Sequence, residues 1–266
     1  MTTSARFRTA YAKQREAEGR GSRGVAELLA LPYLRTGPLA RQWAVRARSY
    51  ECLLRAVVAP LRRARAPQPL KVLDLGAGNG WLCYRLALQG HRCVALDWRR
   101  DAVDGLGAGA AYGAHLAPAL SRVAASFDAL PVKRAFDLVV FNAAIHYTSS
   151  LDGTIGEAVR ATLPGGRLVI LDSPFYGRAV DGERMVAEKR ETARREWGDR
   201  AADLLALRMI EYLTADRLAA ASAPFHLSWR RHRVRYPLWY ELRPLAARAL
   251  GRRPPSRFDV WETVVR

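Results

Sequence analysis

The sequence has few cysteines and lysines, and it lacks long hydrophobic runs. Its three cysteines, Cys52, Cys83 and Cys93, show no metal-ligand spacing, and an odd number does not suit a disulfide framework. We therefore expect buried, reduced thiols and no metal site. No run of about eighteen uncharged apolar residues occurs, and the first residues lack the apolar segment of a signal peptide. We expect a cytoplasmic location.

The charge of the chain is strongly positive, with a formal net charge of +18 and an isoelectric point near 10.8. Such an excess of cations usually indicates an anionic partner, such as nucleic acid or an acidic lipid surface. However, only four of the 43 basic residues are lysines, and the chain is rich in alanine, arginine, leucine and glycine, as GC-rich coding sequence tends to produce. Compositional bias is the explanation that we favour, and selection for an anionic partner stays open.

The N-terminal quarter of the chain shows a helical pattern. Between Pro38 and Arg65 the apolar residues recur at three- and four-residue steps, which is typical of one face of a helix. The segment 65–69 contains two prolines and ends this pattern. We therefore predict an N-terminal helical cap over 1–66 and a main domain over 67–266.

From residue 70 onward, short apolar runs alternate with helical stretches. This alternation predicts an α/β fold with a parallel sheet and crossover helices. The expected strands lie at about 70–75, 92–97, 122–127, 136–142 and 166–172, and the expected helices at about 80–90, 101–112 and 152–162.

The remaining third of the chain predicts a helical insertion followed by the end of the sheet. A polar, charged stretch over 174–213 is expected to form a lid. Thr214 is a plausible N-cap residue for a helix, and further strands are expected near 225–234 and 258–265, so that 214–266 supplies a helix and the last two strands.

A glycine-rich segment at 72–81 carries the strongest functional signal. An apolar strand ends in Asp74 and runs into Gly76, Gly78 and Gly80 just before a helical pattern. Glycines allow a positive φ and a close approach of ligand to backbone, and a helix N-terminus offers free N–H groups. A dinucleotide fingerprint is excluded because Trp81 occupies the place of its third glycine, and no P-loop lysine follows.

The pattern Asp-x-Gly-x-Gly-x-Gly resembles motif I of class I S-adenosylmethionine-dependent methyltransferases. The resemblance implies S-adenosylmethionine as cofactor. It also implies a Rossmann-like seven-stranded sheet, mostly parallel with an antiparallel last strand. The residues of this loop that it assigns to the cofactor are Asp74, Gly76, Ala77, Gly78, Asn79 and Gly80.

Two further acidic residues extend the resemblance. Asp97 lies 23 positions beyond Asp74 at the end of the next expected strand, where a carboxylate can accept hydrogen bonds from ribose hydroxyls. Trp98 follows and either packs on adenine or belongs to the core. The Asp-x-Leu-Pro segment at 128–131 resembles the methyltransferase type 11 domain of ubiquinone and menaquinone biosynthesis enzymes.

By that resemblance, Asp128 binds the adenine amino group with Ala129 beside it; the alternative is a turn-forming surface acid. A Pro-Gly-Gly turn within 163–172 resembles the same family, so the resemblance covers about 70–172. The segment 142–147 leaves the fourth expected strand, and we assign Asn142 to the cofactor site.

The same segment replaces the Asn/Asp-Pro-Pro-Tyr tetrapeptide of enzymes that methylate adenine or glutamine, which disfavours that chemistry. His146 is a candidate general base, although a hydrogen bond that fixes the loop is an equally ordinary role.

These observations together predict an enzyme that transfers a methyl group by in-line displacement to an oxygen or carbon atom of a small molecule. The N-terminal helices and the insertion are expected to cover the acceptor, with Tyr11, Arg15, Tyr147 and Tyr176 at its entrance. The alternatives are methylation of RNA or protein through an arginine-rich surface, and a non-catalytic partner subunit. The acceptor and the oligomeric state stay open.

Apolar and basic residues are mixed in one segment, 236–253. This mixture suits an anionic membrane surface or a hydrophobic acceptor. A packed connection between the last two strands is the alternative that we favour.

Overall fold

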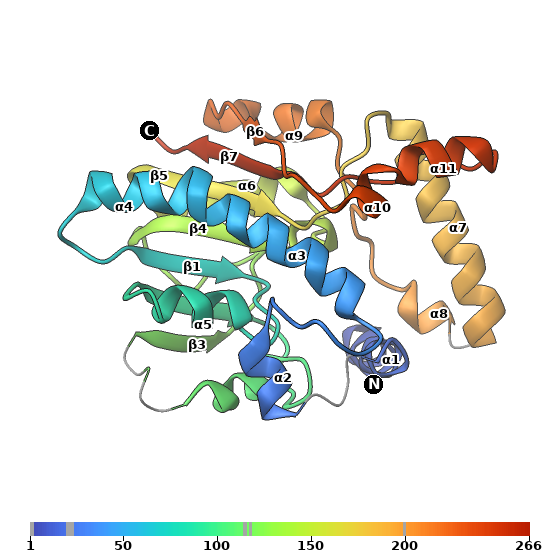
Figure 1. The fold of residues 1–266 in the computed structure, drawn as a ribbon, viewed down its shortest axis with the longest axis horizontal. Coiled ribbons are helices and arrows are strands. Elements are labelled where there is room, and N and C mark those ends of the chain that lie inside the picture. The colour runs from blue at the N-terminus through green and yellow to red at the C-terminus, as the bar shows by residue number, and fades with distance from the viewer. Residues whose placement is uncertain (1–2, 20–23, 114–115, 117–118, 199–200) are drawn as a thin grey trace.

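The computed structural model describes residues 3–19, 24–113, 116, 119–198 and 201–266, and its centre is a seven-stranded sheet. The strand order is β3-β2-β1-β4-β5-β7-β6 (Figure 1). All pairs among the first five strands of this order are parallel, whereas β7 is antiparallel to both β5 and β6. The predicted Rossmann-like sheet with an antiparallel last strand is therefore confirmed.

The strands lie close to their predicted positions. They are β1 (Lys71–Leu75), β2 (Arg92–Asp97), β3 (Leu120–Ala124), β4 (Phe136–Asn142), β5 (Thr162–Leu171), β6 (Arg230–His232) and β7 (Val260–Val264). Every residue of β4 is buried, because helices cover both faces of the central strands. β3 begins two residues earlier than predicted and lies at the sheet edge.

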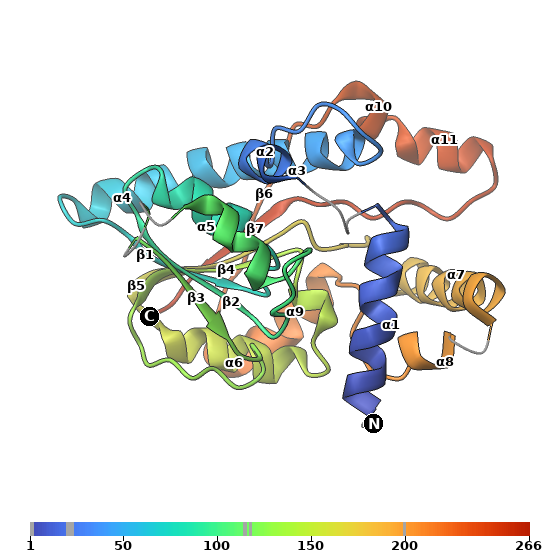
Figure 2. The same ribbon diagram turned by 90° about the horizontal axis from the view of Figure 1, so that it is seen from below.

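Two helical layers cover the sheet (Figure 2). One layer contains α3 (Ala40–Leu53), the π-helical turn η1 (Leu54–Val58), α4 (Ala59–Arg65) and α5 (Trp81–Ala87), and the other contains α6 (Leu151–Ala161) and α9 (Ala215–Ser222). The helix predicted between Pro38 and Arg65 is confirmed. Thr214 is the N-cap residue of α9, since its side chain accepts a hydrogen bond from the Arg217 N–H.

The first layer shares its core with the strands. Trp43, Tyr50 and Leu61 are buried in the same apolar cluster as Val72 and Leu138. The rod of α3, η1 and α4 thus shares one apolar core with the sheet, and the start of α3 extends beyond the strand ends (Figure 1). The division of the chain into domains at residue 66 stays a prediction.

The helix predicted over 101–112 is wrong in its first half. Only η2 (Leu106–Tyr112) is helical, and it is a 3-10 helix. The Asp101 carboxylate accepts hydrogen bonds from the N–H groups of Val103, Asp104 and Gly105, which bends the chain into a turn.

The remaining helices gather at the carboxyl ends of the parallel strands (Figures 1 and 2). They are α1 (Thr3–Ala17), α2 (Val25–Ala30), α7 (Ala179–Trp197), α8 (Ala201–Leu204), α10 (Leu238–Glu241) and α11 (Arg243–Ala249), with the short turn η4 (Ile145–Tyr147); the turn η6 (Ala223–Phe225) instead directly follows α9. α1 lies beside α8, where Arg6 forms an ion pair with Asp203 at 3.9 Å. The predicted insertion is helical as α7 and α8.

The three cysteines are buried and form no disulfide, as the sequence predicts. Within the part of the chain that the structure describes, no helix is long and apolar enough to cross a membrane. The same residues contain no group of three or more side chains suited to holding a metal ion.

Candidate functional site

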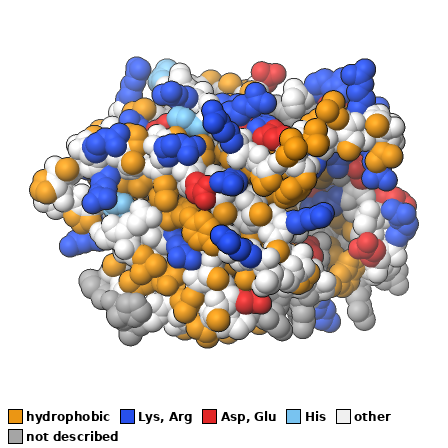
Figure 3. All heavy atoms as spheres, in the orientation of Figure 1, with side chains coloured by type: hydrophobic (Ala, Val, Ile, Leu, Met, Phe, Trp, Pro, Cys, Tyr) orange, Lys and Arg blue, Asp and Glu red, His pale blue; other side chains and the backbone are white. Residues whose placement is uncertain are grey.

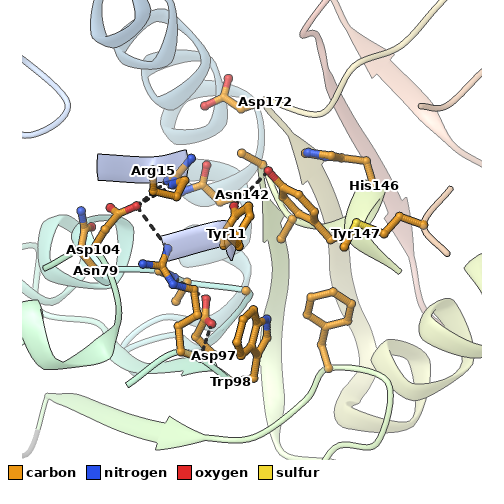
Figure 4. A pocket seen from close by; sticks show the side chains of 18 of the residues that line it. Tyr11, Arg15, Asn79, Asp97, Trp98, Asp104, Asn142, His146, Tyr147 and Asp172 are labelled. Carbon is orange, nitrogen blue, oxygen red and sulfur yellow. Dashed lines mark hydrogen bonds and ion pairs between the residues drawn. The ribbon is translucent and has the colours of Figure 1, made fainter. Parts of the chain in front are cut away.

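A cavity of about 650 Å³ opens at the carboxyl ends of the parallel strands, the edge where open α/β sheets bind ligands. It reaches from the ends of β1 and β2 across β4 to β5, and residues of α1 and α3 cover it. Its lining combines aromatic, acidic and cationic side chains around the glycine-rich loop (Figure 4).

The loop after β1 forms one wall of this cavity and is held tightly against its neighbours. The N–H groups of Gly76 and Ala77 both donate to the Leu96 carbonyl. Gly76 has a φ of +74°, and a Cβ atom at this position would lie 2.5 Å from the Ala144 Cβ. Gly78 has a φ of +56°. Glycine is therefore required at Gly76 by both conformation and space, and at Gly78 by conformation.

Asp97 lies at the end of β2 and fixes the same loop. Its carboxylate accepts the Gly78 N–H at 2.7 Å and the Arg99 N–H at 2.8 Å. The side chain lines the cavity, and its burial raises the pKa of the carboxyl group. Trp98 lines the cavity beside it (Figure 4). These two predicted residues and the loop thus face one space.

Asp128 and Asn142 line the same cavity from β3 and β4. The Oδ1 atom of Asp128 accepts hydrogen bonds from the hydroxyls of Thr148 and Thr154 at 3.0 and 2.8 Å, which fixes its carboxylate. Asn142 is buried, and its Oδ1 atom has no hydrogen-bond partner among the described residues. A ligand that donates a hydrogen bond would satisfy this atom.

Three predicted cofactor residues lie outside the cavity lining, namely Asp74, Gly80 and Ala129. Asp74 is fully buried, its carboxyl group lacks a hydrogen-bond partner in the described part of the chain, and burial and the nearby Asp97 raise its pKa. Gly80 has a φ of +79° and directly precedes α5, so it shapes the loop. Asn79, which was also predicted, lines the cavity.

The helix α1 supplies a further part of the cavity lining. The Tyr11 hydroxyl donates to the Tyr147 hydroxyl at 3.3 Å, and Arg15 binds Asp104 at 2.5 Å. Arg99 reaches the same Asp104 carboxylate at 3.4 Å. Tyr11, Arg15 and Tyr147 therefore meet in the cavity although they are distant in sequence.

Tyr176 lies apart from these residues. Its side chain is buried, and its hydroxyl accepts a hydrogen bond from Arg253 at 2.9 Å. It is not among the residues that line the cavity.

His146 lines the cavity from the turn after β4, and its Nδ1 atom lies 3.4 Å from the Ser173 hydroxyl. Burial lowers the pKa of the imidazole to about 3, and the positive charges of Lys189, Arg46 and Arg15 lower it in the same direction. The ring is therefore neutral at physiological pH and is a weak proton acceptor.

Four charged residues of the cavity were not predicted from the sequence, namely Arg46, Asp172 and the already described Arg99 and Asp104. Arg46 lies on α3 with its guanidinium over the Trp43 ring, and it forms no ion pair with any described residue. Asp172 directly follows β5 with a φ of +52°, and both carboxylate oxygens are buried without a hydrogen-bond partner in the described part of the chain. Burial raises its pKa.

A family model described as methyltransferase domain matches residues 73–170 of this chain. The chain is 31% identical over 221 residues to the malonyl-[acyl-carrier protein] O-methyltransferase of Methylococcus capsulatus, covering 77% of this chain and 72% of that protein. It is 33% identical over 110 residues to the enzyme of the same name from Erwinia pyrifoliae, covering 41% and 39% of the two chains.

The fold agrees with these sequence matches. The crystal structure of magnesium protoporphyrin IX methyltransferase from Synechocystis, with bound S-adenosylhomocysteine, superposes with a TM-score of 0.58 and 17% identity. The superposition covers 97% of this chain and all of that one. The sheet is Rossmann-like, and the glycine-rich loop after β1 lines a cavity large enough for a small ligand. Together they define a Rossmann-like enzyme. The chain belongs to the class I S-adenosylmethionine-dependent methyltransferases.

Proposed function

We propose that this enzyme methylates an oxygen atom of a small, acidic acceptor that binds in the same cavity as the cofactor. One observation carries the proposal. A single cavity of about 650 Å³ is lined both by the glycine-rich loop and by Arg46 and Asp172, which form no ion pair within 4 Å among the described residues. A cavity of this size is typical of small-molecule sites. S-adenosylmethionine supplies the electrophilic methyl group when it is bound.

The residues on the loop side fit the cofactor. Gly76 and Gly78 bring bare backbone to the cavity wall, and Asp97 presents a carboxylate in reach of ribose hydroxyls. Trp98 offers a flat apolar face for adenine, and Asp128 offers an acceptor for its amino group. Asn142 would gain a partner for its buried Oδ1 atom.

The other side of the cavity favours an anionic acceptor. Burial lowers the pKa of His146, and the charges of Lys189, Arg46 and Arg15 lower it further; of these cations, Lys189 pairs with Glu211 at 2.8 Å. Arg15 is already paired with Asp104, whereas Arg46 forms no ion pair within 4 Å among the described residues, although its charge lowers the pKa of the Asp172 carboxyl group. A carboxylate acceptor would form an ion pair with Arg46 and would need no base, because it arrives deprotonated.

The Asp172 carboxylate adds a second requirement for the chemistry of the acceptor. A buried carboxylate without a hydrogen-bond partner is costly, and a ligand that donates a hydrogen bond removes that cost. The proposed acceptor therefore carries an acidic oxygen for Arg46 and a hydroxyl or amino group for Asp172. The neutral His146 would orient the acceptor by a hydrogen bond.

The printed name of the Methylococcus relative describes methylation of a malonyl oxygen, which supports an acidic oxygen as the acceptor atom here. We extend the proposal to the cap and the lid. The helices within 1–66 and the insertion 174–213 would enclose the acceptor, with Tyr11 and Tyr147 at the entrance. A cytoplasmic location is part of the same proposal.

The test is a transfer assay with radiolabelled S-adenosylmethionine and paired acceptors. Each carboxylic acid that bears a hydroxyl or amino group is assayed beside its primary amide and its methyl ester. We expect labelled product from acids alone, and Arg46→Met should raise the KM for the acid at least tenfold while cofactor affinity stays unchanged. Turnover of amides or simple alcohols with no turnover of acids would refute the acidic acceptor.

A further inference from the structure

An exposed apolar surface lies on α10 and α11, at the end of the molecule opposite to α4 (Figure 1). We call it the α10–α11 surface. Its apolar members and their exposed fractions are Leu238 (73%), Trp239 (43%), Leu242 (45%), Leu245 (64%) and Leu250 (64%). The expected packed connection is therefore wrong for these five side chains, although Tyr236 and Tyr240 of the same segment are buried.

The spacing of the leucines explains their common direction. Leu238, Leu242 and Leu245 are separated by four and three residues, so they share one helical face. Backbone hydrogen bonds from Leu242 to Leu238 and from Ala246 to Leu242 carry the helical path across the break between the two helices. The inward side is already filled, because Tyr240 packs there beneath the Arg243 guanidinium, 3.8 Å from its ring centroid.

Positive charge surrounds this surface. From residue 242 to residue 258 the chain has five arginines and no acidic residue, and Glu241, the acid of α10, is paired with Arg257. Arg253 and Arg257 form ion pairs with glutamates, whereas Arg248 and Arg252 are exposed and form no ion pair with any described residue. Figure 3 shows hydrophobic side chains beside blue cationic ones over α10 and α11.

We propose that the α10–α11 surface attaches the enzyme to an anionic phospholipid membrane. The leucines and Trp239 would enter the boundary between headgroups and acyl chains, and Arg248 and Arg252 would contact lipid phosphates. Among the described residues, the two exposed charges of this surface without an ion pair, Arg248 and Arg252, are both positive. This favours lipid over a protein groove, since phosphates cover an anionic bilayer uniformly and leucines can enter it without a preformed pocket.

The surface is connected to the proposed acceptor entrance. Arg253, just beyond α11, binds Glu188 of α7 at 2.7 Å and Tyr176 at 2.9 Å. It also lines a second cavity, of about 520 Å³, which shares Tyr11 and Tyr147 with the first. Membrane attachment would therefore hold the entrance near the bilayer surface. This inference does not depend on the identity of the acceptor.

The experiment is co-sedimentation of the full chain with vesicles of pure phosphatidylcholine or of equimolar phosphatidylcholine and phosphatidylglycerol. We expect binding to the anionic vesicles that decreases from low to physiological salt, because the attraction is screened over about 8 Å. Arg248→Gln with Arg252→Gln should lower the partition coefficient about thirtyfold. The matched control, Arg62→Gln with Arg63→Gln on α4, removes the same charge and should change it far less.

A second pair of variants tests the apolar part. Leu242→Ser with Leu245→Ser should lower the partition coefficient by about tenfold per leucine, whereas Leu88→Ser, at a side chain that is 50% exposed elsewhere, should leave it unchanged. Circular dichroism melting checks that each variant is folded, and Leu245→Ser alone replaces the pair if the pair unfolds. Absence of binding to anionic vesicles, or equal losses in the arginine pair and its α4 control, would overturn the proposal.

Discussion

Replacement of Asp97 by asparagine should weaken the binding of S-adenosylmethionine. The Asp97 carboxylate holds the Gly78 and Arg99 N–H groups at 2.7 and 2.8 Å and is proposed to accept the ribose hydroxyls. Asparagine retains one acceptor oxygen and places an NH₂ group against one of these donors. A lost hydrogen bond to a charged acceptor costs about 1.5–3 kcal/mol, so affinity should decrease roughly tenfold to a hundredfold.

Titration calorimetry with S-adenosylmethionine measures this loss, and thermal melting of the same samples shows whether the fold is retained. The matched control is Asp152→Asn, which neutralises an exposed carboxylate in the first turn of α6 and should leave the affinity unchanged. If Asp97→Asn binds as tightly as the wild type and melts at the same temperature, Asp97 does not bind the ribose.

Three further predictions concern other residues of the cavity. Gly78→Val should abolish cofactor binding in calorimetry, because a β-branched residue is strained at a φ of +56° and fills the cavity wall; normal binding would place the ligand elsewhere. Burial and nearby cations lower the folded-state pKa of His146 to about 3, so protonation favours the unfolded chain as pH falls below about 6.5. Between pH 7 and 5 the wild type should therefore lose about 2 kcal/mol more unfolding free energy than His146→Gln in urea titrations, and equal losses would contradict the neutral imidazole. Asp172→Asn should leave cofactor affinity unchanged but lower kcat/KM for the acceptor at least tenfold; an unaltered kcat/KM would remove Asp172 from the acceptor site.

Most of the fold could be predicted because its strands are continuous apolar runs. β2 and β4 begin and end where the sequence places them, since buried parallel strands leave little choice of residue type. The segment at 101–112 was predicted poorly because the Asp101 carboxylate accepts hydrogen bonds from the following backbone N–H groups, which outweigh helical propensity there. No periodicity reveals such a turn.

The cofactor side of the site could be predicted from local motifs, and the acceptor side could not. The glycine-rich loop follows β1 and Asp97 is the last residue of the neighbouring parallel strand β2, so chain order places both at one sheet edge. Arg46 gives no signal, because it lies on a helix assigned to a separate cap whereas α3 packs on the sheet beside the cavity. Asp172 gives a local signal, since it is an acid directly after an apolar strand, but it lies outside the segments to which the family resemblance assigns cofactor residues.

The most direct test of the central claim is calorimetric titration of the wild-type chain with S-adenosylmethionine and, separately, with NADH. The glycines of the loop and the Asp97 carboxylate predict binding of S-adenosylmethionine at one site per chain and no heat of binding with NADH. Binding of NADH, or absence of S-adenosylmethionine binding by folded protein, would contradict the account.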